Sequence, residues 1–413
     1  MKTVSCFSSR ARITALALLA AWFAGLCEGH AQLPSAQFPG GLTCHKTPPE
    51  GHVTSNPIAC TVSCANGGTV ASALALAPRT TAGLTITIKG TCVEAVDQVP
   101  GNVTLEGAAS GDGLQAPDAS SNPVLGISGA GVTLNNLTIS GGVTALLVRS
   151  GATAAGNNLM IEGSSGRNVM ANGVITLNSS SIENSSGHGI DALSGGIVFL
   201  NGGTVRSNSR GFQIGSASYV AVDAGAVISG STATGAVVSS GGALTLRSGT
   251  IENNSPDGIN INNGGIATLL GGLAVVSSNA RDGVRVFGGS ARTLGGVISN
   301  NGGHGISVFN SGTAILDTGV VVAANAANGV LVEDGTVNVG NGDGSAAIQS
   351  NSANGIYLKT NSVGYFNNAA NQIVSNGGWG ILCDGPPANP LIAGTIGTVS
   401  GNGAGQISCN IAP

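Results

Sequence analysis

Short apolar stretches alternate with stretches rich in Gly, Asn and Ser along most of this chain, and the alternation repeats. A glycine followed by apolar, variable and apolar residues recurs, as in GIDAL from Gly189, GVRVF from Gly283 and GIYLK from Gly355. Alternation with a period of two over so few residues predicts a short strand with one buried face. We call these glycines the marker glycines, and the repeat length that they define is about 24 residues. The marker glycines are Gly142, Gly166, Gly189, Gly211, Gly235, Gly258, Gly283, Gly305, Gly329, Gly355 and Gly380.

Two further apolar pieces accompany each marker glycine. One follows it within about ten residues, as in GALTL from Gly242, and another precedes the next marker glycine, as in GTIENN from Gly249. Three short strands per repeat, joined by corners rich in Gly, Asn and Ser, predict one coil of a parallel β-helix in which successive repeats stack.

Asparagine recurs four residues before the marker glycine in the last six repeats. Equivalent residues of stacked strands lie about 4.8 Å apart, so side-chain amides in one column can form a ladder of hydrogen bonds. Asparagine also tolerates the left-handed backbone that a sharp corner needs. The earlier repeats place Ser185, Ser207 and Ser231 in this column. The predicted ladder consists of Asn254, Asn279, Asn301, Asn325, Asn351 and Asn376.

The repeated pattern I-x-N-N-x-x-x-G-I-x-V resembles that of right-handed parallel β-helix proteins of the pectin-lyase-like superfamily, over roughly residues 84–383. The resemblance implies an all-β, right-handed solenoid of about 11–12 coils of about 24 residues. The stretch Thr69–Pro78 predicts a short helix before the first coil, and in that superfamily such a helix commonly covers the N-terminal end. The expected division is a signal peptide (1–31), an N-terminal cap region (32–83), the β-helix (84–383) and a C-terminal cap (384–413).

The first residues have the features of a signal peptide. Basic residues precede the apolar run Ile13–Leu26, and the small residues Gly29–Ala31 follow it, so cleavage is predicted near Ala31 and the protein is expected to be secreted or periplasmic. The run is short for a membrane span, and no later segment replaces it. Cys27 leaves lipoprotein processing as an alternative, although Leu26 is large for that pathway.

Six cysteines remain after such cleavage, and all lie near the two ends of the chain. An even number in an oxidising compartment favours disulfides. A zinc site at CTVSC is the alternative, but no second Cys/His pair at zinc spacing accompanies it. We predict the pairs Cys44–Cys60, Cys64–Cys92 and Cys383–Cys409.

The composition narrows the class of partner. Glycine accounts for 68 of 413 residues, charged residues for 8% and aromatic residues for 3%. Without the signal peptide the chain keeps 12 basic and 18 acidic residues, a net charge near −6, and it has no basic stretch interleaved with aromatic residues. This pattern argues against a nucleic-acid partner.

Two copies of Gly-His-Gly, at His188 and His304, pose the question of an active site. Both histidines occupy the position before a marker glycine, and five coils separate them, about 24 Å, so they cannot share one site. Family 28 polygalacturonases carry Gly-His-Gly together with Asp-Asp, R-x-K and an upstream N-x-D; this chain lacks the first two and has its one N-x-D downstream. The motifs of pectate lyases and the DPHD motif of alginate epimerases are also absent. We therefore interpret this column as a variable, outward-facing corner.

One cluster remains as a candidate catalytic site: Asp257, Asp282, Arg285 and His304. The two aspartates are in register on consecutive coils, about 5 Å apart, and His304 follows one coil later. Two such carboxylates could bind Ca²⁺. In lyases of this fold Ca²⁺ bridges Asp side chains to an acidic sugar and an Arg can act as base, so the resemblance implies these roles for Asp257 and Asp282 with Arg281 or Arg285. The alternative is that all these groups face solvent at a corner and neutralise one another; no other cofactor is expected.

The few aromatic residues concentrate near the C-terminal end of the repeats. Tyr357, Tyr365, Phe366 and Trp379 could contact a sugar through their ring faces, or could seal the last coils. Both interpretations stay open.

Three functions are compatible with these patterns. The first is a non-catalytic extracellular or envelope protein, expected to be monomeric, that offers a Ser/Thr/Asn face to a polysaccharide or a surface. The second is a lyase or hydrolase of acidic glycans with a site around Asp257, Asp282 and Arg285. The third is an adhesin. The absence of a complete catalytic motif favours the first and leaves enzymatic activity undecided.

Overall fold

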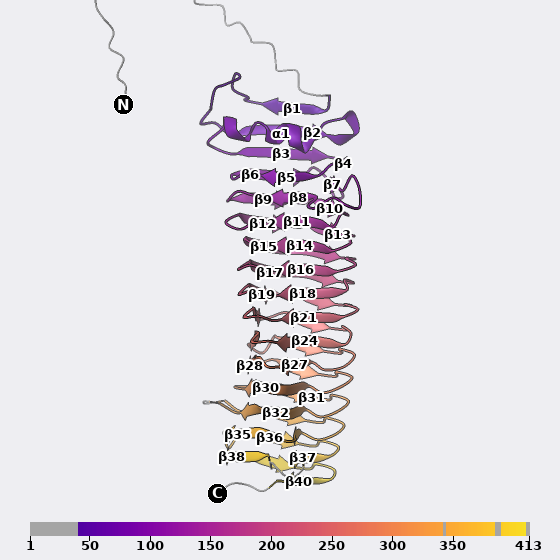
Figure 1. The fold of residues 1–413 in the computed structure, drawn as a ribbon, viewed down its shortest axis with the longest axis vertical. Coiled ribbons are helices and arrows are strands. Elements are labelled where there is room, and N and C mark those ends of the chain that lie inside the picture. The colour runs from indigo at the N-terminus through magenta and orange to yellow at the C-terminus, as the bar shows by residue number, and fades with distance from the viewer. Residues whose placement is uncertain (1–39, 342–343, 385–389, 410–413) are drawn as a thin grey trace, which may run out of the picture. The chain divides into compact units, whose positions relative to one another are not determined.

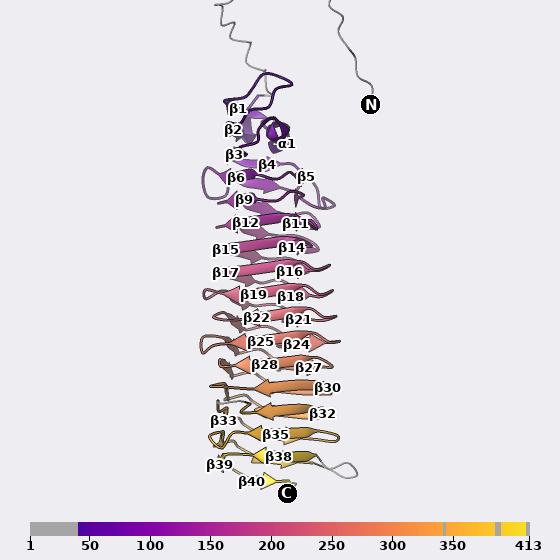
Figure 2. The same ribbon diagram turned by 90° about the vertical axis from the view of Figure 1, so that its left-hand side faces the viewer.

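The computed structural model describes residues 40–341, 344–384 and 390–409. The predicted signal peptide (1–31), its cleavage near Ala31 and the lipoprotein alternative at Cys27 lie outside these residues. The described chain winds into stacked coils of short strands, which form a right-handed parallel β-helix (Figures 1 and 2). The predicted fold class is thereby confirmed.

From β3 onward, each coil contributes one strand to each of three parallel stacks, and β2 adds a further strand to the first stack. The first stack begins with β2 and ends with β38, and its strands pair in parallel from coil to coil. The strands of the first stack are β2 (Ile58–Ser63), β3 (Leu84–Lys89), β6 (Val103–Gly107), β9 (Val132–Asn135), β12 (Thr153–Asn157), β15 (Val174–Glu183), β17 (Ile197–Arg206), β19 (Tyr219–Asp223), β22 (Ala243–Leu246), β25 (Ile266–Leu270), β28 (Ser290–Leu294), β30 (Ile306–Leu316), β32 (Val330–Val339), β35 (Val363–Asn367) and β38 (Leu391–Thr395).

The second stack follows the first around each coil, and the long strands β15 and β17 bend from one into the other. Its remaining strands are β4 (Thr91–Val93), β7 (Gly113–Gln115), β10 (Thr138–Ser140), β13 (Met160–Glu162), β20 (Val227–Ser229), β23 (Thr250–Glu252), β26 (Val275–Ser277), β29 (Val297–Ser299), β31 (Val321–Ala323), β33 (Ala347–Gln349), β36 (Gln372–Val374) and β39 (Thr398–Ser400).

The third stack contains the strands that begin near the marker glycines, and β30 and β32 run from it into the first stack of the following coil. Its remaining strands are β5 (Val96–Val99), β8 (Leu125–Ile127), β11 (Thr144–Val148), β14 (Arg167–Ala171), β16 (His188–Ala192), β18 (Arg210–Ile214), β21 (Thr234–Val238), β24 (Asp257–Asn262), β27 (Val284–Phe287), β34 (Ile356–Leu358), β37 (Trp379–Cys383) and β40 (Gly405–Ser408).

The number of coils exceeds the predicted 11–12. The structure has about 15, because parallel pairing begins at β2 and continues through β38, β39 and β40, outside the expected range 84–383. Alternate residues of most strands are buried, and these side chains form one continuous apolar core. The coils at the two ends lack clear marker glycines, so the repeat alone undercounted them.

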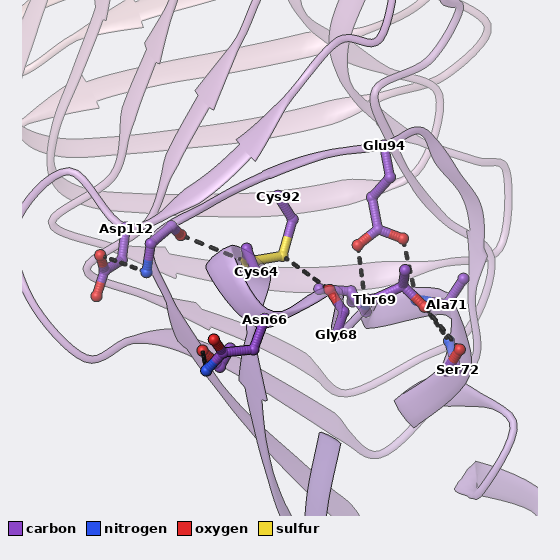
Figure 3. Close-up of a disulfide and its surroundings, with 12 residues drawn as sticks. Cys64, Asn66, Gly68, Thr69, Ala71, Ser72, Cys92, Glu94 and Asp112 are labelled. Atoms are coloured by element: carbon purple, nitrogen blue, oxygen red, sulfur yellow. Dashed lines mark hydrogen bonds between the residues drawn. A yellow bond between two sulfur atoms is a disulfide. The ribbon is translucent and has the colours of Figure 1, made fainter. Parts of the chain in front are cut away.

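The N-terminal end is closed by non-repeating elements. Strand β1 (Leu42–His45) pairs with β2 in the antiparallel direction, and the predicted helix is present as α1 (Val70–Leu74), followed by a 3₁₀ turn at Ala77–Arg79. The helix begins after Thr69, whose hydroxyl accepts the Ser72 N–H. Both carboxylate oxygens of Glu94 accept N–H groups of the first helical turn, at 2.6 and 3.2 Å (Figure 3). A carboxylate at a helix N-terminus satisfies free N–H groups and is favoured by the helix dipole.

Disulfides reinforce both ends. The structure joins Cys44 to Cys60, Cys64 to Cys92 and Cys383 to Cys409, the three predicted pairs, and Figure 3 shows the second of them beside α1. The zinc alternative at CTVSC is therefore wrong, because both of its cysteines are disulfide-bonded. Terminal coils have stacking partners on one side only, so cross-links there restrain the part of a solenoid that is most easily unfolded.

The predicted asparagine ladder is present and buried. Each side-chain Nδ2 donates to the Oδ1 of the next asparagine at 2.9–3.1 Å, from Asn254 to Asn376 and on to Asn402. The same Oδ1 atoms also accept the backbone N–H of the preceding ladder residue. Buried amides are stable only when their hydrogen-bonding groups are paired, and here the neighbouring coils provide the partners.

Two details of the predicted ladder need correction. In the repeat before Gly211 the ladder residue is Asn208 and not Ser207: the Oδ1 of Asn208 accepts the Ser185 N–H at 2.9 Å. The left-handed backbone lies one residue before the ladder, for example at Asn253 (φ 55°) and Asn300 (φ 57°). The ladder residue itself is needed for its amide, and the residue before it turns the corner.

The marker glycine and the ladder asparagine form one packing unit. A Cβ at Gly258 would lie 2.6 Å from Nδ2 of Asn279, and one at Gly283 would lie 2.7 Å from Nδ2 of Asn301. Any larger residue would therefore occupy the space of the asparagine on the next coil. This steric exclusion explains why glycine and asparagine repeat together.

The first two marker glycines are not in this column. The pairing of β11, β14 and β16 places Asn168 opposite Gly189, so Gly142 and Gly166 are out of register with the later glycines. Asn168 points its own amide into the ladder, where Nδ2 donates to the Glu183 carbonyl at 2.7 Å. The shift changes which residues are neighbours on the third stack.

Candidate functional site

The predicted candidate residue Asp257 is fully buried, with an exposed fraction of 0%. Arg281, on the next coil, forms a two-point ion pair with it: Nε to Oδ1 at 2.8 Å and Nη2 to Oδ2 at 2.6 Å. This hydrogen bond is the main reason that the pKa of Arg281 is raised. A carboxylate whose two oxygens are both bound by one guanidinium offers no free face to a sugar in this conformation.

Asp282 is also buried, with 4% exposed. Its Oδ1 accepts the His304 N–H at 2.9 Å, and its Oδ2 accepts the Ser307 hydroxyl at 2.7 Å. The alternative that both aspartates face solvent at a corner is therefore wrong. Its idea of mutual neutralisation holds for Asp257 and Arg281, which is the bidentate pair.

Asp257, Asp282 and His304 belong to a second hydrogen-bonded column, which we call the corner file. Each member accepts, through its side chain, the backbone N–H of the member on the next coil, at 2.8–3.3 Å. What the members share is an acceptor atom at the same distance from the backbone, so Asp, His and Asn are interchangeable here. The corner file consists of Asp257, Asp282, His304, Asn328 and Asn354, and it ends at the N–H of Trp379.

His304 is held in the corner file as a neutral acceptor. Its Nδ1 accepts the Asn328 N–H at 3.2 Å, which places the ring proton on Nε2. Burial lowers the pKa of His304, although the negative charge of Asp282 opposes the shift. The second Gly-His-Gly therefore has a structural use in this conformation.

Arg285 does not join the predicted cluster. Its guanidinium carbon lies 5.2 Å from the ring centre of Phe309, a cation–π arrangement. Within the described ranges, no group of three or more His, Cys, Asp or Glu side chains is placed to hold a metal ion. The structure thus brings Asp257, Asp282 and His304 into one file and leaves Arg285 outside it.

A different group of polar residues gathers on β14, β16 and β18, earlier in the same stack. We call it the arginine–histidine cluster; it consists of Arg167, His188, Asp191, Arg210 and Gln213. Asp191 lies beneath it, with 3% of its side chain exposed, and its Oδ2 lies 3.1 Å from Arg167 Nη1 and 3.3 Å from His188 Nδ1. The His188 side chain is 29% exposed, so a buried carboxylate lies under a partly exposed imidazole.

The contacts of His188 define its tautomer. Arg210 Nη1 lies 3.1 Å from His188 Nε2, and a guanidinium can only donate. The Nε2 atom is therefore the acceptor, and the ring proton sits on Nδ1, directed at Asp191. Arg210 Nη1 also donates to Gln213 Oε1 at 2.6 Å. Burial lowers the pKa of Arg210, an effect that the charge of Asp191 opposes.

Two buried polar atoms of this cluster have no protein partner. Among the seven buried side-chain atoms without a hydrogen bond in the described residues are Asp191 Oδ1 and Arg210 Nε. Arg149 Nε and Asn172 Oδ1 are also among them, but these residues directly follow β11 and β14, at the opposite end of the strands from Arg167 and Arg210. Unsatisfied buried groups cost free energy and are rare, so Asp191 and Arg210 leave hydrogen-bonding capacity at the cluster for ordered water or a ligand.

The cluster escaped prediction because of the register shift. The marker-glycine alignment placed Ser165 opposite His188, whereas the strands place Arg167 there. A search for ionisable residues close to His188 in the sequence would have found Asp191, three residues later in GHGIDAL. Its two arginine neighbours could be assigned only from the strand pairing.

The C-terminal aromatic residues divide between the two interpretations. Phe366 is fully buried and packs in the core, as sealing requires, whereas Tyr365 is exposed. The Tyr357 hydroxyl donates to Asp384 at 2.5 Å, and this hydrogen bond is the main reason that the pKa of Tyr357 is raised to about 12. The ammonium group of Lys359 lies 5.6 Å from the centre of the Tyr357 ring, a cation–π arrangement. These contacts occupy Tyr357 within the protein.

Comparisons with known proteins give structural likenesses at low sequence identity. No family model matches the chain, and no curated protein matches it. Among solved structures, the A-module of mannuronan C-5 epimerase AlgE4 from Azotobacter vinelandii is 15% identical, with a TM-score of 0.49 over 78% of this chain and 95% of that one. The periplasmic alginate epimerase AlgG is 12% identical, with a TM-score of 0.38 over 98% and 100% of the two chains. The Dettilon tailspike protein is 11% identical, with a TM-score of 0.38 over 84% and 68%.

These likenesses are too distant to carry an argument about activity. The strand pairing itself defines the class: this is a disulfide-reinforced parallel β-helix protein. In the described part of the chain, no helix has the length and apolar character needed to cross a bilayer.

Proposed function

We propose that the protein is a secreted or periplasmic polysaccharide-binding protein, and that an acidic sugar chain binds on the third stack at the arginine–histidine cluster. The observation that carries the proposal is the pair of buried polar atoms without partners there, Asp191 Oδ1 and Arg210 Nε, beside the guanidinium of Arg167. The three disulfides support the compartment, because such bonds persist where conditions are oxidising.

The charges of this face favour an anionic partner. Arg167 and Arg210 lie on either side of the coil that contains Asp191, whose charge acts on both. Arg149 follows β11, one coil before Arg167, and pairs with Asp97. The mature chain is otherwise acidic, so this face is a local exception. Guanidinium groups bind carboxylates through two parallel hydrogen bonds, and the guanidinium of Arg210 lies at this face with its buried Nε unpaired.

Spacing also suits a polymer. Successive coils present equivalent side chains about 4.8 Å apart, which is close to the length of one sugar ring, so adjacent coils can contact adjacent residues of one chain. The proposal needs no catalytic residue, and binding alone is the function that these contacts support best.

The test is binding of the mature protein to polygalacturonate and to alginate, measured by isothermal titration calorimetry, with dextran as the uncharged comparison. We expect Arg210→Gln to weaken binding to at least one acidic polymer by about tenfold. Arg247→Gln is the matched control, because Arg247 is an exposed arginine whose nearest carboxylate, on Asp223, is 3.9 Å away. Equal binding by the wild type and Arg210→Gln, or no binding to any acidic polymer, contradicts the proposal.

An enzymatic function is the second candidate, and the tautomer of His188 favours it. Its Nε2 lone pair is directed away from Asp191 and toward Arg210, so a sugar carboxylate that drew Arg210 away would expose a neutral base. The same incubations, read at 235 nm for unsaturated products and by reducing-end assay, test it. Loss of product formation in His188→Gln with binding retained supports an enzyme. If the polymer is still intact after long incubation, the enzymatic function is excluded and binding remains as the proposed function.

Asp257 and Asp282 remain an untested alternative as catalytic or Ca²⁺-binding residues. Activity that needs Ca²⁺, is abolished by EDTA and is lost in Asp282→Asn would assign the reaction to them. Because both aspartates are buried and hydrogen-bonded in the corner file, the arginine–histidine cluster is the favoured binding site.

A further inference from the structure

A pocket of about 490 Å³ lies on the N-terminal coils, where the first stack turns into the second. Its volume is typical of small-molecule sites. The loop after β6 forms one wall, and the corners after β9, β12 and within β15 form the other. Its lining includes Ala109, Asn136, Thr138, Asn158, Met160 and Ser179.

The loop wall is held in place from behind by Asp112. Its Oδ2 accepts the Ala109 N–H and its Oδ1 accepts the Gly90 N–H, both at 2.8 Å. The Asp112 carbonyl accepts the Thr138 N–H on the next coil at 3.0 Å. Figure 3 shows Asp112 on this loop, near the disulfide between Cys64 and Cys92. The pocket is therefore formed before any ligand arrives, which reduces the entropy cost of binding.

The opposite wall consists of polar corner residues with a left-handed backbone. Asn136 (φ 52°), Asn158 (φ 52°) and Ser179 (φ 48°) occupy equivalent corners on three successive coils. Asn158 Nδ2 donates to Asn136 Oδ1 at 3.2 Å. Within the described residues, Asn136 Nδ2 and Asn158 Oδ1 then have no protein partner, so one donor and one acceptor remain for a ligand.

The chemistry of the lining selects the ligand. None of the lining residues is ionisable, whereas the amides and hydroxyls can each donate or accept, as sugar hydroxyls do. Met160 adds an apolar surface, with 39% of the residue exposed, for the C–H face of a ring. We propose that this pocket binds an uncharged sugar unit, at a site separate from the arginine–histidine cluster.

The test uses cellotriose, mannotriose and maltotriose as uncharged probes and trigalacturonate as the acidic one, followed by saturation-transfer NMR and calorimetry. We expect at least one uncharged trisaccharide to bind and Asn158→Gly to weaken it by about tenfold. Glycine keeps the left-handed backbone, so this change removes the amide with little strain. Ser179→Gly is a second variant of the same kind. Asn263→Gly is the matched control, since Asn263 is an exposed asparagine at φ 47° outside the pocket.

The result separates this proposal from the acidic-polysaccharide proposal. Trigalacturonate binding that Asn158→Gly leaves unchanged, with loss of the uncharged trisaccharide, supports two sites. Absence of binding by all three uncharged probes overturns the pocket proposal, as does binding that both glycine variants leave intact. Neither of those outcomes bears on the effect of Arg210→Gln.

Discussion

The two Gly-His-Gly segments of this protein place histidine at equivalent points of the third stack, but the surroundings differ. At the N-terminal copy, strands β16 and β18 include the corner residue, and backbone carbonyls satisfy its N–H: His188 N–H bonds to Gly166 O at 2.8 Å and Arg210 N–H to Gly187 O at 3.0 Å. The side chains of His188 and Arg210 therefore do not have to accept a backbone N–H. They lie over Asp191 and are partly exposed to solvent.

At the C-terminal copy the corner residue lies outside its strand, because β27 begins at Val284 and β30 at Ile306. The marker glycine N–H now bonds to the corner carbonyl of the next coil, as Gly283 N–H does to His304 O at 2.9 Å. The corner N–H has no backbone partner, and the side chain below must accept it. The same motif therefore supports the backbone of the next coil in one half and belongs to a partly exposed cluster of charged side chains in the other.

The largest expected effect tests the structural half. Asp282→Leu removes the acceptor of the partly buried His304 N–H and of the buried Ser307 hydroxyl, so the free energy of unfolding should fall by about 3 kcal/mol. Urea denaturation measures this loss. Asp282→Asn keeps an acceptor and should lose less than about 1 kcal/mol. Equal loss in both variants would show that the corner file does not act through its acceptor atoms.

The glycine–asparagine unit is common to both halves and should respond alike. A Cβ at Gly189 would lie 2.7 Å from Asn208 Nδ2, and one at Gly283 would lie 2.7 Å from Asn301 Nδ2. We expect Gly189→Ala and Gly283→Ala each to lower the free energy of unfolding by about 1–3 kcal/mol, because the ladder must shift. A melting experiment in which only one variant is destabilised would break the equivalence.

The corner file also predicts a pH dependence. The pKa of His304 is lowered in the folded protein, so the unfolded chain binds more protons just below pH about 6.5 and stability must fall as the pH drops through that range. His304→Asn keeps an acceptor without a titrating group, and its stability should fall less steeply there. Parallel stability–pH curves for the two proteins, measured by urea denaturation, would exclude this role for His304.

The smallest effect separates the two halves in function. Arg285→Gln removes the cation–π contact with Phe309, which is worth about 0.5–1 kcal/mol at an exposed site. Binding of acidic polymers should stay within about twofold of the wild type, because Arg285 lies outside the arginine–histidine cluster. A loss of binding as large as that in Arg210→Gln would extend the binding face along the whole third stack.

The sequence by itself determined the fold and its interior. Period-two alternation, the repeat of about 24 residues and the glycine–asparagine spacing all follow from packing that is identical on every coil, so each repeat confirms the next. The cysteines could be paired in advance because they cluster at the two ends, where few partners compete.

Only the tertiary structure decided which side chains meet on the surface. A two-residue shift at Asn168 moved Arg167 opposite His188, and an exchange of hydrogen-bond partners at the corners buried Asp257 and Asp282. Neither event disturbs the inward alternation, since a shift of two residues keeps every apolar side chain on the same face. Core packing is therefore readable from a repeat, whereas neighbour relations between coils depend on loop lengths and backbone pairing that the repeat does not encode.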